Sequence, residues 1–180
     1  MKSLIILAER ESDSLGAAIA RGAAAELTGQ GAPVRIHDLY AMRFQPALQQ
    51  SDFAAWQRGE QPRDLQPLQA DVDWAELLLL IYPIRLGGTP AMLKGYIDRV
   101  FAQGFAYGVR DGKMAGFLAG KRAMLCPTTT EPAGLTESMR QVMGAATLTF
   151  CGVEIAAEHA GPVSELQVCG WIREMRTAGL

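Results

Sequence analysis

Apolar residues occur along this chain in two alternating patterns. Mainly apolar runs of strand length stand at Leu4–Ala8, Val34–His37, Leu77–Tyr82, Arg122–Cys126 and Leu148–Ala156. Between them, apolar side chains recur about once per helical turn, which predicts helices at residues 15–29, 65–74, 89–103, 139–146 and 164–175. The third run is apolar on both faces, as a central parallel strand is. Strands that alternate with helices predict an α/β fold built on a mostly parallel sheet.

Five strands with intervening helices fit a flavodoxin-like arrangement. Its five-stranded parallel sheet has the strand order 2-1-3-4-5, with helices on both faces. In such sheets ligands bind beyond the carboxyl ends of the strands, at the switch point beside strands one and three. The segments 9–15, 83–89 and 127–135 are therefore the candidate site.

The segment that follows residue 88 carries the clearest helical signals. Thr89 is the expected N-cap, and Pro90 suits the first helical position. A single apolar stripe then contains Met92, Leu93, Tyr96, Ile97, Val100 and Phe101. Gly104 is expected to end the helix.

The composition is that of an ordinary globular protein, and 180 residues suggest one domain spanning residues 1–180. A net charge of −2 offers no basic field for nucleic acid. No apolar run approaches the ~20 residues of a membrane span, and the start lacks the features of a signal peptide. Three scattered cysteines indicate the reducing cytoplasm, and only two histidines argue against a His-rich metal site.

Three sequence elements together resemble a known family: Asp38-Leu39-Tyr40, Pro90-Ala91-Met92-Leu93-Lys94-Gly95 and Gly104-Phe105-Ala106-Tyr107. They look like the NAD(P)H:quinone oxidoreductases, which are flavodoxin-like flavoenzymes, and the resemblance runs from the first strand to Phe150-Cys151-Gly152. It implies FMN or FAD as cofactor and a homodimer with its site at the subunit interface. It also implies hydride transfer from NAD(P)H by way of the flavin to a quinone-like or other small aromatic acceptor.

In the first loop, the resemblance places the flavin phosphate at the start of the first helix, near Ser12, Ser14 and Leu15. Glu9 stands where the family usually has His, and Asp13 stands where a hydroxyl residue is common. A carboxylate ~4 Å from a phosphate costs on the order of 1–4 kcal/mol in a partly solvated site. The alternative for this segment is a charged surface turn that binds no phosphate.

The second and third loops also depart from the family pattern. By resemblance, the flavin ring contacts Pro83, Ile84, Arg85, Leu86, Thr128, Thr129 and Thr130. The family's Trp is missing from the second loop, where Arg85 would favour the anionic reduced flavin or else face solvent. In the third loop, bulkier residues including Glu131 replace glycines. These departures keep two alternatives open: a redox-inactive dimeric binding or regulatory subunit, and a specialised biosynthetic enzyme with an altered flavin site.

The remaining candidates are aromatic residues and histidines. Tyr107 and Phe105 match an element that walls the substrate pocket, often from the partner subunit, although core packing is the simpler interpretation for Phe105. His37 and His159 are expected to be structural, and no catalytic acid or base is assigned. Gly16 replaces an Asn that would contact the adenine side of FAD, which slightly favours FMN.

Overall fold

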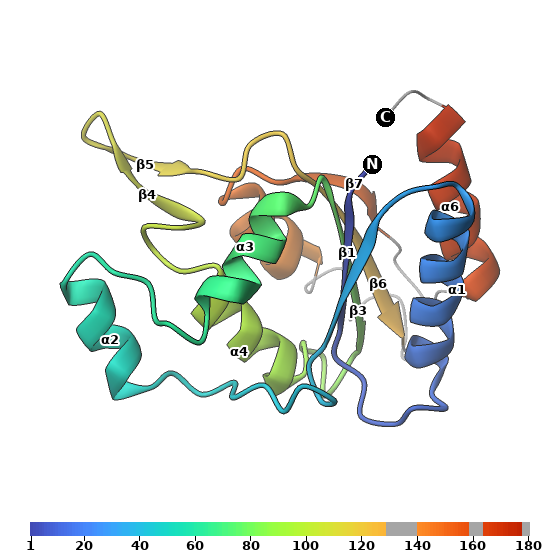
Figure 1. Ribbon diagram of the computed structural model, residues 1–180, viewed down its shortest axis with the longest axis horizontal. Helices are drawn as coiled ribbons and strands as arrows, with labels where there is room; N and C mark the ends of the chain where they lie inside the picture. Colours follow the sequence, from blue (N-terminus) through green and yellow to red (C-terminus); the bar gives the residue numbers. More distant parts are fainter. Residues whose placement is uncertain (129–139, 159–163, 178–180) are drawn as a thin grey trace.

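The computed structural model describes residues 1–128, 140–158 and 164–177. Its centre is a parallel sheet of five strands in the order β2-β1-β3-β6-β7 (Figure 1). These strands are β1 (Ser3–Leu7), β2 (Val34–Asp38), β3 (Leu77–Pro83), β6 (Arg122–Thr128) and β7 (Glu154–Glu158). Numbered within the sheet alone, this is the predicted order 2-1-3-4-5, so the predicted topology is confirmed.

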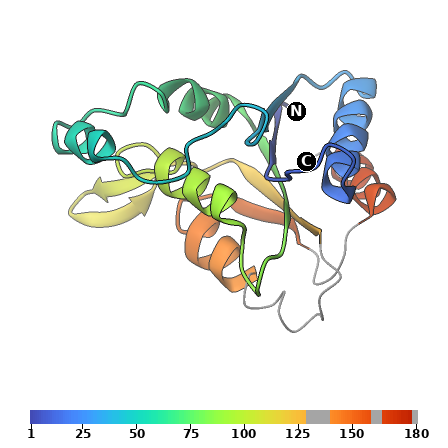
Figure 2. The ribbon, with the colours of Figure 1, turned by 90° about the horizontal axis from the view of Figure 1, so that it is seen from below.

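Helices cover both faces of the sheet, as predicted (Figure 2). One face carries α1 (Leu15–Gly29) and α6 (Glu165–Thr177), and the other carries α3 (Gln66–Trp74), α4 (Ala91–Val100) and η1 (Arg140–Thr149), a helix of π type. The short helix α2 (Gln50–Gln57) lies on the side of α3 and α4 that faces away from the sheet (Figure 1). Alternate residues of β1 enter the two cores, Leu4 and Ile6 on one face and Ile5 and Leu7 on the other, because strand side chains alternate in direction.

Several of the predicted element boundaries are wrong. α4 ends at Val100 with Phe101 as its C-cap residue, so Gly104 does not end the helix. α4 begins at Ala91, because Pro90 has an extended backbone and is itself the N-cap residue, so Thr89 does not cap the helix. The fifth strand of the sheet begins at Glu154, because residues up to Thr149 belong to η1 and the chain then turns at Gly152, whose φ is 93°. Apolar content alone did not separate the end of that helix from the strand.

Pro127 was expected to end the fourth strand, yet it lies inside β6. It is paired with Tyr82 of β3, whereas β7 pairs with β6 only as far as Leu125. Among the described residues, β6 has no partner strand on the β7 side beyond Leu125, and proline is tolerated where one side of a strand is unpaired.

A hairpin after α4 was not predicted. It consists of β4 (Tyr107–Arg110) and β5 (Lys113–Gly116), joined by Asp111 and Gly112, which have φ angles of 53° and 73°. An Asp-Gly pair with positive φ at both residues is the strongest short-range hairpin signal, so this element was readable from the sequence. Within the described residues, no helix is long and apolar enough to cross a bilayer.

Candidate functional site

The carboxyl ends of β1, β3 and β6 meet at one edge of the sheet. Leu7 is in register with Ile81, and Pro83 is in register with Thr128. The N–H of Ala8 donates to the carbonyl of Ile81 at 2.9 Å, which keeps the chain beside β3 as it leaves β1. The first two candidate segments, 9–15 and 83–89, therefore leave the sheet side by side, next to Thr128 at the end of β6. Thr129, Thr130, Glu131 and the rest of the third predicted loop lie outside the described residues, as does His159.

The first loop presents the N-terminus of α1. Ser14 is the N-cap, and its Oγ accepts the N–H of Ala17 at 3.1 Å. The first turn contains no acidic residue, and the N–H groups of Leu15 and Gly16 have no acceptor among the described residues. Free N–H groups and the helix dipole together favour an anion at this position.

Ser12 and Asp13, which precede the N-cap residue, leave their side chains available. Ser12 is exposed, and its carbonyl accepts Nη1 of Arg21 at 2.8 Å, which ties the loop to the second turn of α1. Asp13 is exposed and forms no ion pair within the described ranges. Both side chains are thus free to face a ligand or water.

Glu9 connects the first loop to the third. Its Oε1 accepts the hydroxyl of buried Thr128 at 2.8 Å, across 119 residues of sequence. Its Cγ lies where a side chain at position 16 would be, since a Cβ added to Gly16 would approach that atom to 2.5 Å. The carboxylate therefore rests against the first turn of α1, and Gly16 provides the room for it.

The second loop is a tight turn. Arg85 and Gly88 exchange two backbone hydrogen bonds of 2.9 and 3.0 Å, and the intervening Leu86 and Gly87 have φ angles of 50° and 71°. A leucine in the left-handed region costs about 1–2 kcal/mol, so the backbone here is strained. The side chain of Leu86 is fully exposed, and that of Arg85 is exposed with no ion pair to another described residue. Ile84, in contrast, is buried at the root of the turn.

Tyr107 and Phe105 do not join these loops. α4 starts directly after segment 83–89 and runs for ten residues, or about 15 Å, before the chain reaches them (Figure 1). Tyr107 lines a groove of about 840 Å³ together with Phe53 and Trp56 of α2, and its ring lies 5.3 Å from that of Phe150. Phe105 packs against the core, as the simpler interpretation had it.

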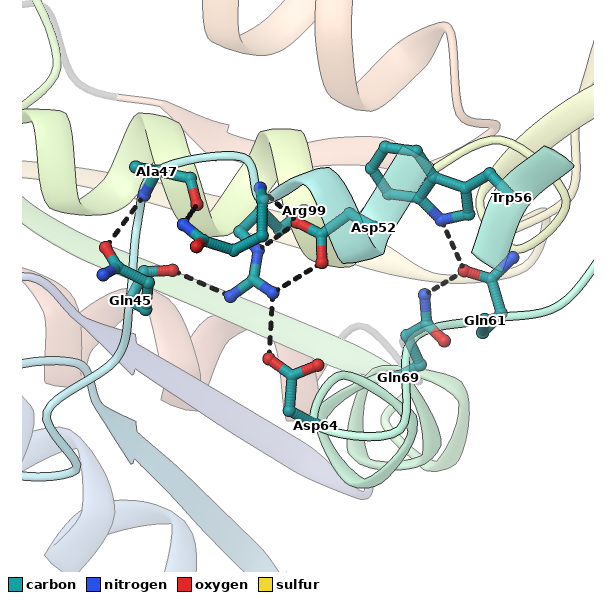
Figure 3. A network of polar contacts seen from close by, with 9 residues as sticks. Gln45, Ala47, Asp52, Trp56, Gln61, Asp64, Gln69 and Arg99 are labelled. Carbon is teal, nitrogen blue, oxygen red and sulfur yellow. Dashed lines mark hydrogen bonds and ion pairs between the residues drawn. The ribbon is translucent and has the colours of Figure 1, made fainter. Parts of the chain in front are cut away.

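The wall of this groove is held by a buried ion-pair cluster that the sequence did not suggest (Figure 3). Arg99 of α4, only 2% exposed, donates to both carboxylate oxygens of Asp52 at 2.7 and 2.8 Å and to Asp64 at 2.9 Å. A further bond reaches the carbonyl of Gln45 at 2.9 Å. Burial alone would raise the pKa of Asp52, but hydrogen bonds from Arg99 and the Gln49 N–H, with the charge of Arg99, hold it below its usual value.

The floor of the groove contains a small amide network. Oε1 of Gln61 accepts from the Trp56 indole at 3.3 Å and from Gln69 at 3.0 Å (Figure 3). The amide nitrogen of Gln61 donates to the carbonyl of Gln103 at 3.1 Å. The orientation of both the indole and the Gln61 amide is thereby fixed. The groove thus offers two aromatic walls and a preset polar floor.

His37 lies in the core, and both of its ring nitrogens are hydrogen-bonded. Nδ1 lies 2.9 Å from the hydroxyl of Tyr96, and Nε2 lies 2.9 Å from Asp71. Burial, with the charge of Asp71, raises the pKa of Tyr96, so this hydroxyl stays protonated. Its buried, fully bonded position supports the predicted structural role. Among the described residues, no group of three or more His, Cys, Asp or Glu side chains is arranged to hold a metal ion.

Known proteins match this chain over most of its length. Residues 1–162 match a family described by its flavodoxin-like fold. An uncharacterised NAD(P)H oxidoreductase of Haemophilus influenzae is 33% identical over 161 residues, which cover 86% of this chain and 80% of that protein. Ribosyldihydronicotinamide dehydrogenase (quinone) of Mus musculus is 30% identical over 182 residues, 87% of this chain and 79% of the mouse protein. A Klebsiella pneumoniae structure provisionally named a quinone reductase superposes with a TM-score of 0.85 at 27% identity, covering 99% of this chain and 84% of its own.

Proposed function

Since this chain belongs to the flavodoxin-like NAD(P)H:quinone oxidoreductases and is an oxidoreductase, we propose that it works with a flavin, FMN or FAD. The flavin supplies the redox chemistry when bound, so that a hydride from NAD(P)H reaches a quinone-like or other small aromatic acceptor. The observation that carries this proposal is the meeting of the β1, β3 and β6 ends beside the free N–H groups of α1.

The donor set at this edge fits the phosphate of a flavin. The N–H groups of Leu15 and Gly16 have no internal acceptor, and the Ser14 hydroxyl retains a hydrogen to donate after accepting from Ala17. One feature opposes the fit, because the Glu9 carboxylate rests against the same helix turn. The phosphate would therefore be held by the chain's first loop, with Glu9 as its competitor.

The second loop would lie along the ring of the flavin. Pro83 and buried Ile84 give it an apolar base, and the paired bonds between Arg85 and Gly88 fix its shape. The guanidinium of Arg85 is free of internal ion pairs within the described chain, so it can stabilise negative charge that develops on reduction. No side chain of the described loops is assigned to proton transfer.

We place the acceptor between two copies of the chain. Tyr107, Phe53 and Trp56 form an aromatic groove at the end of α4 away from segment 83–89, about 15 Å along that helix. A groove at that distance serves the flavin of a partner better than its own. A homodimer therefore accounts for why an aromatic groove and the strand-end loops lie apart in one chain. Three buried, unpaired cysteines support a cytoplasmic location, where thiols stay reduced.

The test is flavin uptake followed by turnover. The purified chain is incubated with FMN or FAD, desalted, and examined for the visible absorption band of oxidised flavin. Loss of the band on anaerobic addition of NADH or NADPH, and its return with a small benzoquinone, is the expected result. A colourless protein that forms a dimer would favour the binding or regulatory alternative. Bleaching without recovery by quinones, but with recovery by another oxidant, would favour the specialised biosynthetic enzyme.

A further inference from the structure

We propose that Glu9 is an internal competitor for the flavin phosphate, so that this chain holds its flavin as an exchangeable ligand. The proposal rests on the proposed function, because it assumes that a flavin binds at the carboxyl edge of the sheet. Its own content is that a carboxylate already lies against the first turn of α1, beside the position that an anion would occupy. A phosphate can bind there only if the carboxylate moves away or if the two negative charges remain close together, which costs free energy.

The position of Glu9 is set by its place after β1 and by two contacts with other parts of the chain. β1 ends at Leu7 and places Glu9 two residues beyond the sheet edge. The Thr128 hydroxyl, buried at the end of β6, donates to Oε1 at 2.8 Å. The first turn of α1 supplies the last contact, because a Cβ at Gly16 would lie 2.5 Å from Cγ and 2.9 Å from Oε1. The hydrogen bond from Thr128 and the contact with the first turn of α1 together hold the Glu9 carboxylate in place.

Two charge arguments follow from that geometry. α1 has no acidic residue in its first turn, and the Glu9 carboxylate rests against that turn, close to the positive end of the helix dipole. The phosphate monoester of FMN carries a charge of roughly −1.5 to −2 at neutral pH. The diphosphate of FAD is also anionic, and either group would meet this carboxylate at close range. Repulsion between the phosphate and Glu9 should therefore weaken the binding of FMN and FAD. Riboflavin has the same ring and no phosphate, so its binding should not be affected.

The decisive variant is Glu9→Gln. The amide keeps the size of the side chain and an oxygen to accept the Thr128 hydroxyl, and it removes the charge. Glu11→Gln is the matched control, because Glu11 is in the same loop, is 70% exposed and faces Arg10 at 3.7 Å. Both variants change the net charge equally, so a difference between them reports the position of the charge.

The first measurement is the dissociation constant of FMN, FAD and riboflavin for the wild type and both variants. We expect Glu9→Gln to tighten FMN and FAD binding about tenfold, which is ~1.4 kcal/mol, and to leave riboflavin within about twofold. Glu11→Gln should leave all three within about twofold to threefold. Unchanged or weaker FMN binding by Glu9→Gln, or an equal gain for riboflavin, would overturn the proposal.

A second measurement separates this inference from the proposed function. If no variant binds any flavin, the proposed function fails, and inorganic phosphate then serves as the probe. Phosphate should raise the melting temperature of Glu9→Gln more than that of the wild type or of Glu11→Gln, because only that variant lacks the negative charge beside the α1 N-terminus. Equal shifts for the three proteins would overturn the role of Glu9 independently of any flavin.

Discussion

The two ends of α4 use charge in opposite ways. Near its C-terminal end, the Arg99 cluster, formed by Arg99, Asp52, Asp64 and the carbonyl of Gln45, satisfies a guanidinium that is only 2% exposed. Beyond its N-terminal end, the strand-end loops 9–15 and 83–89 expose Asp13 and Arg85, which have no ion-pair partner among the described residues. One helix thus joins a region of internally paired charge to a region of unpaired charge.

The difference shows which charges hold the fold and which are available to a ligand. A buried charge needs partners that replace its lost hydration. The charges of the Arg99 cluster therefore stabilise the fold and are not available to a ligand. Exposed charges contribute little to stability, since water and salt screen them. Changes in the cluster should therefore alter stability first, and changes in the strand-end loops should alter binding or redox properties at unchanged stability.

The largest effect is expected from placing a charge beside the cluster without a partner. Val100 is fully buried next to Arg99, and Val100→Asp should cost about 4 kcal/mol or more, because a lone buried carboxylate has nothing to replace its hydration. The variant should lose its cooperative thermal transition. Val109→Asp, at a position 64% exposed, should melt like the wild type. A normal melting curve for Val100→Asp would refute the assignment of Val100 to the core.

Removing the guanidinium should come next. Arg99→Met should lose about 3–5 kcal/mol of unfolding free energy in urea, because it leaves Asp52 buried and unpaired. Arg58→Met, which removes an exposed pair with Glu60, should change the stability by less than about 0.5 kcal/mol. Asp64→Asn should cost less than Arg99→Met, since the Asp64 side chain is 62% exposed.

The pH dependence of the unfolding free energy tests the role of Asp52 independently. The pKa of Asp52 is held below its usual value in the wild type, so its stabilisation is present above the unfolded pKa and is lost as pH falls through the folded one. In Arg99→Met, burial without the ion pair should raise that pKa, and protonation should relieve the unpaired charge. The deficit of the variant relative to the wild type should therefore narrow as the solution is acidified. A deficit that widens with acid would contradict the assigned role of Asp52.

In the strand-end loops, Asp13 should act on affinity. Asp13→Thr removes an exposed carboxylate near the proposed phosphate position and should tighten FMN binding up to about tenfold, or ~1.4 kcal/mol. Its melting temperature without flavin should match that of the wild type. Isothermal titration of the flavin-free protein measures the change, and weaker binding would mean that Asp13 supports the loop instead.

The smallest effect is expected from Arg85. Arg85→Gln should leave the binding of oxidised flavin unchanged and lower the reduction potential by about 10–20 mV, since an exposed cation contributes about 0.5–1 kcal/mol and 30 mV corresponds to ~1.4 kcal/mol. Redox titrations of the wild type and the variant, both with flavin bound, measure the difference in reduction potential. Equal potentials would place Arg85 away from the flavin.

Sequence reasoning performed unevenly on the two regions. It selected the strand-end loops through the topology of the sheet, and the structure brings Glu9 and Thr128 together there. It did not find the Arg99 cluster, although an arginine between Ile97 and Val100 of the buried stripe was a signal that a charge would need partners. It also passed over the Asp111-Gly112 turn, whose hairpin supplies Tyr107 to the groove.

The sequence by itself determined the elements that depend on local periodicity. β1 and β3 follow from continuous apolar runs of strand length, and α1 and the body of α4 follow from apolar residues that recur about every 3.6 positions. The order of strands and helices then restricts the sheet to a flavodoxin-like topology. The tertiary structure alone decided which distant side chains meet. Asp52 and Arg99 are 47 residues apart, and Glu9 and Thr128 are 119 apart. Such pairs leave no periodic trace in the chain, because their geometry is set by how helices and loops pack around the completed sheet.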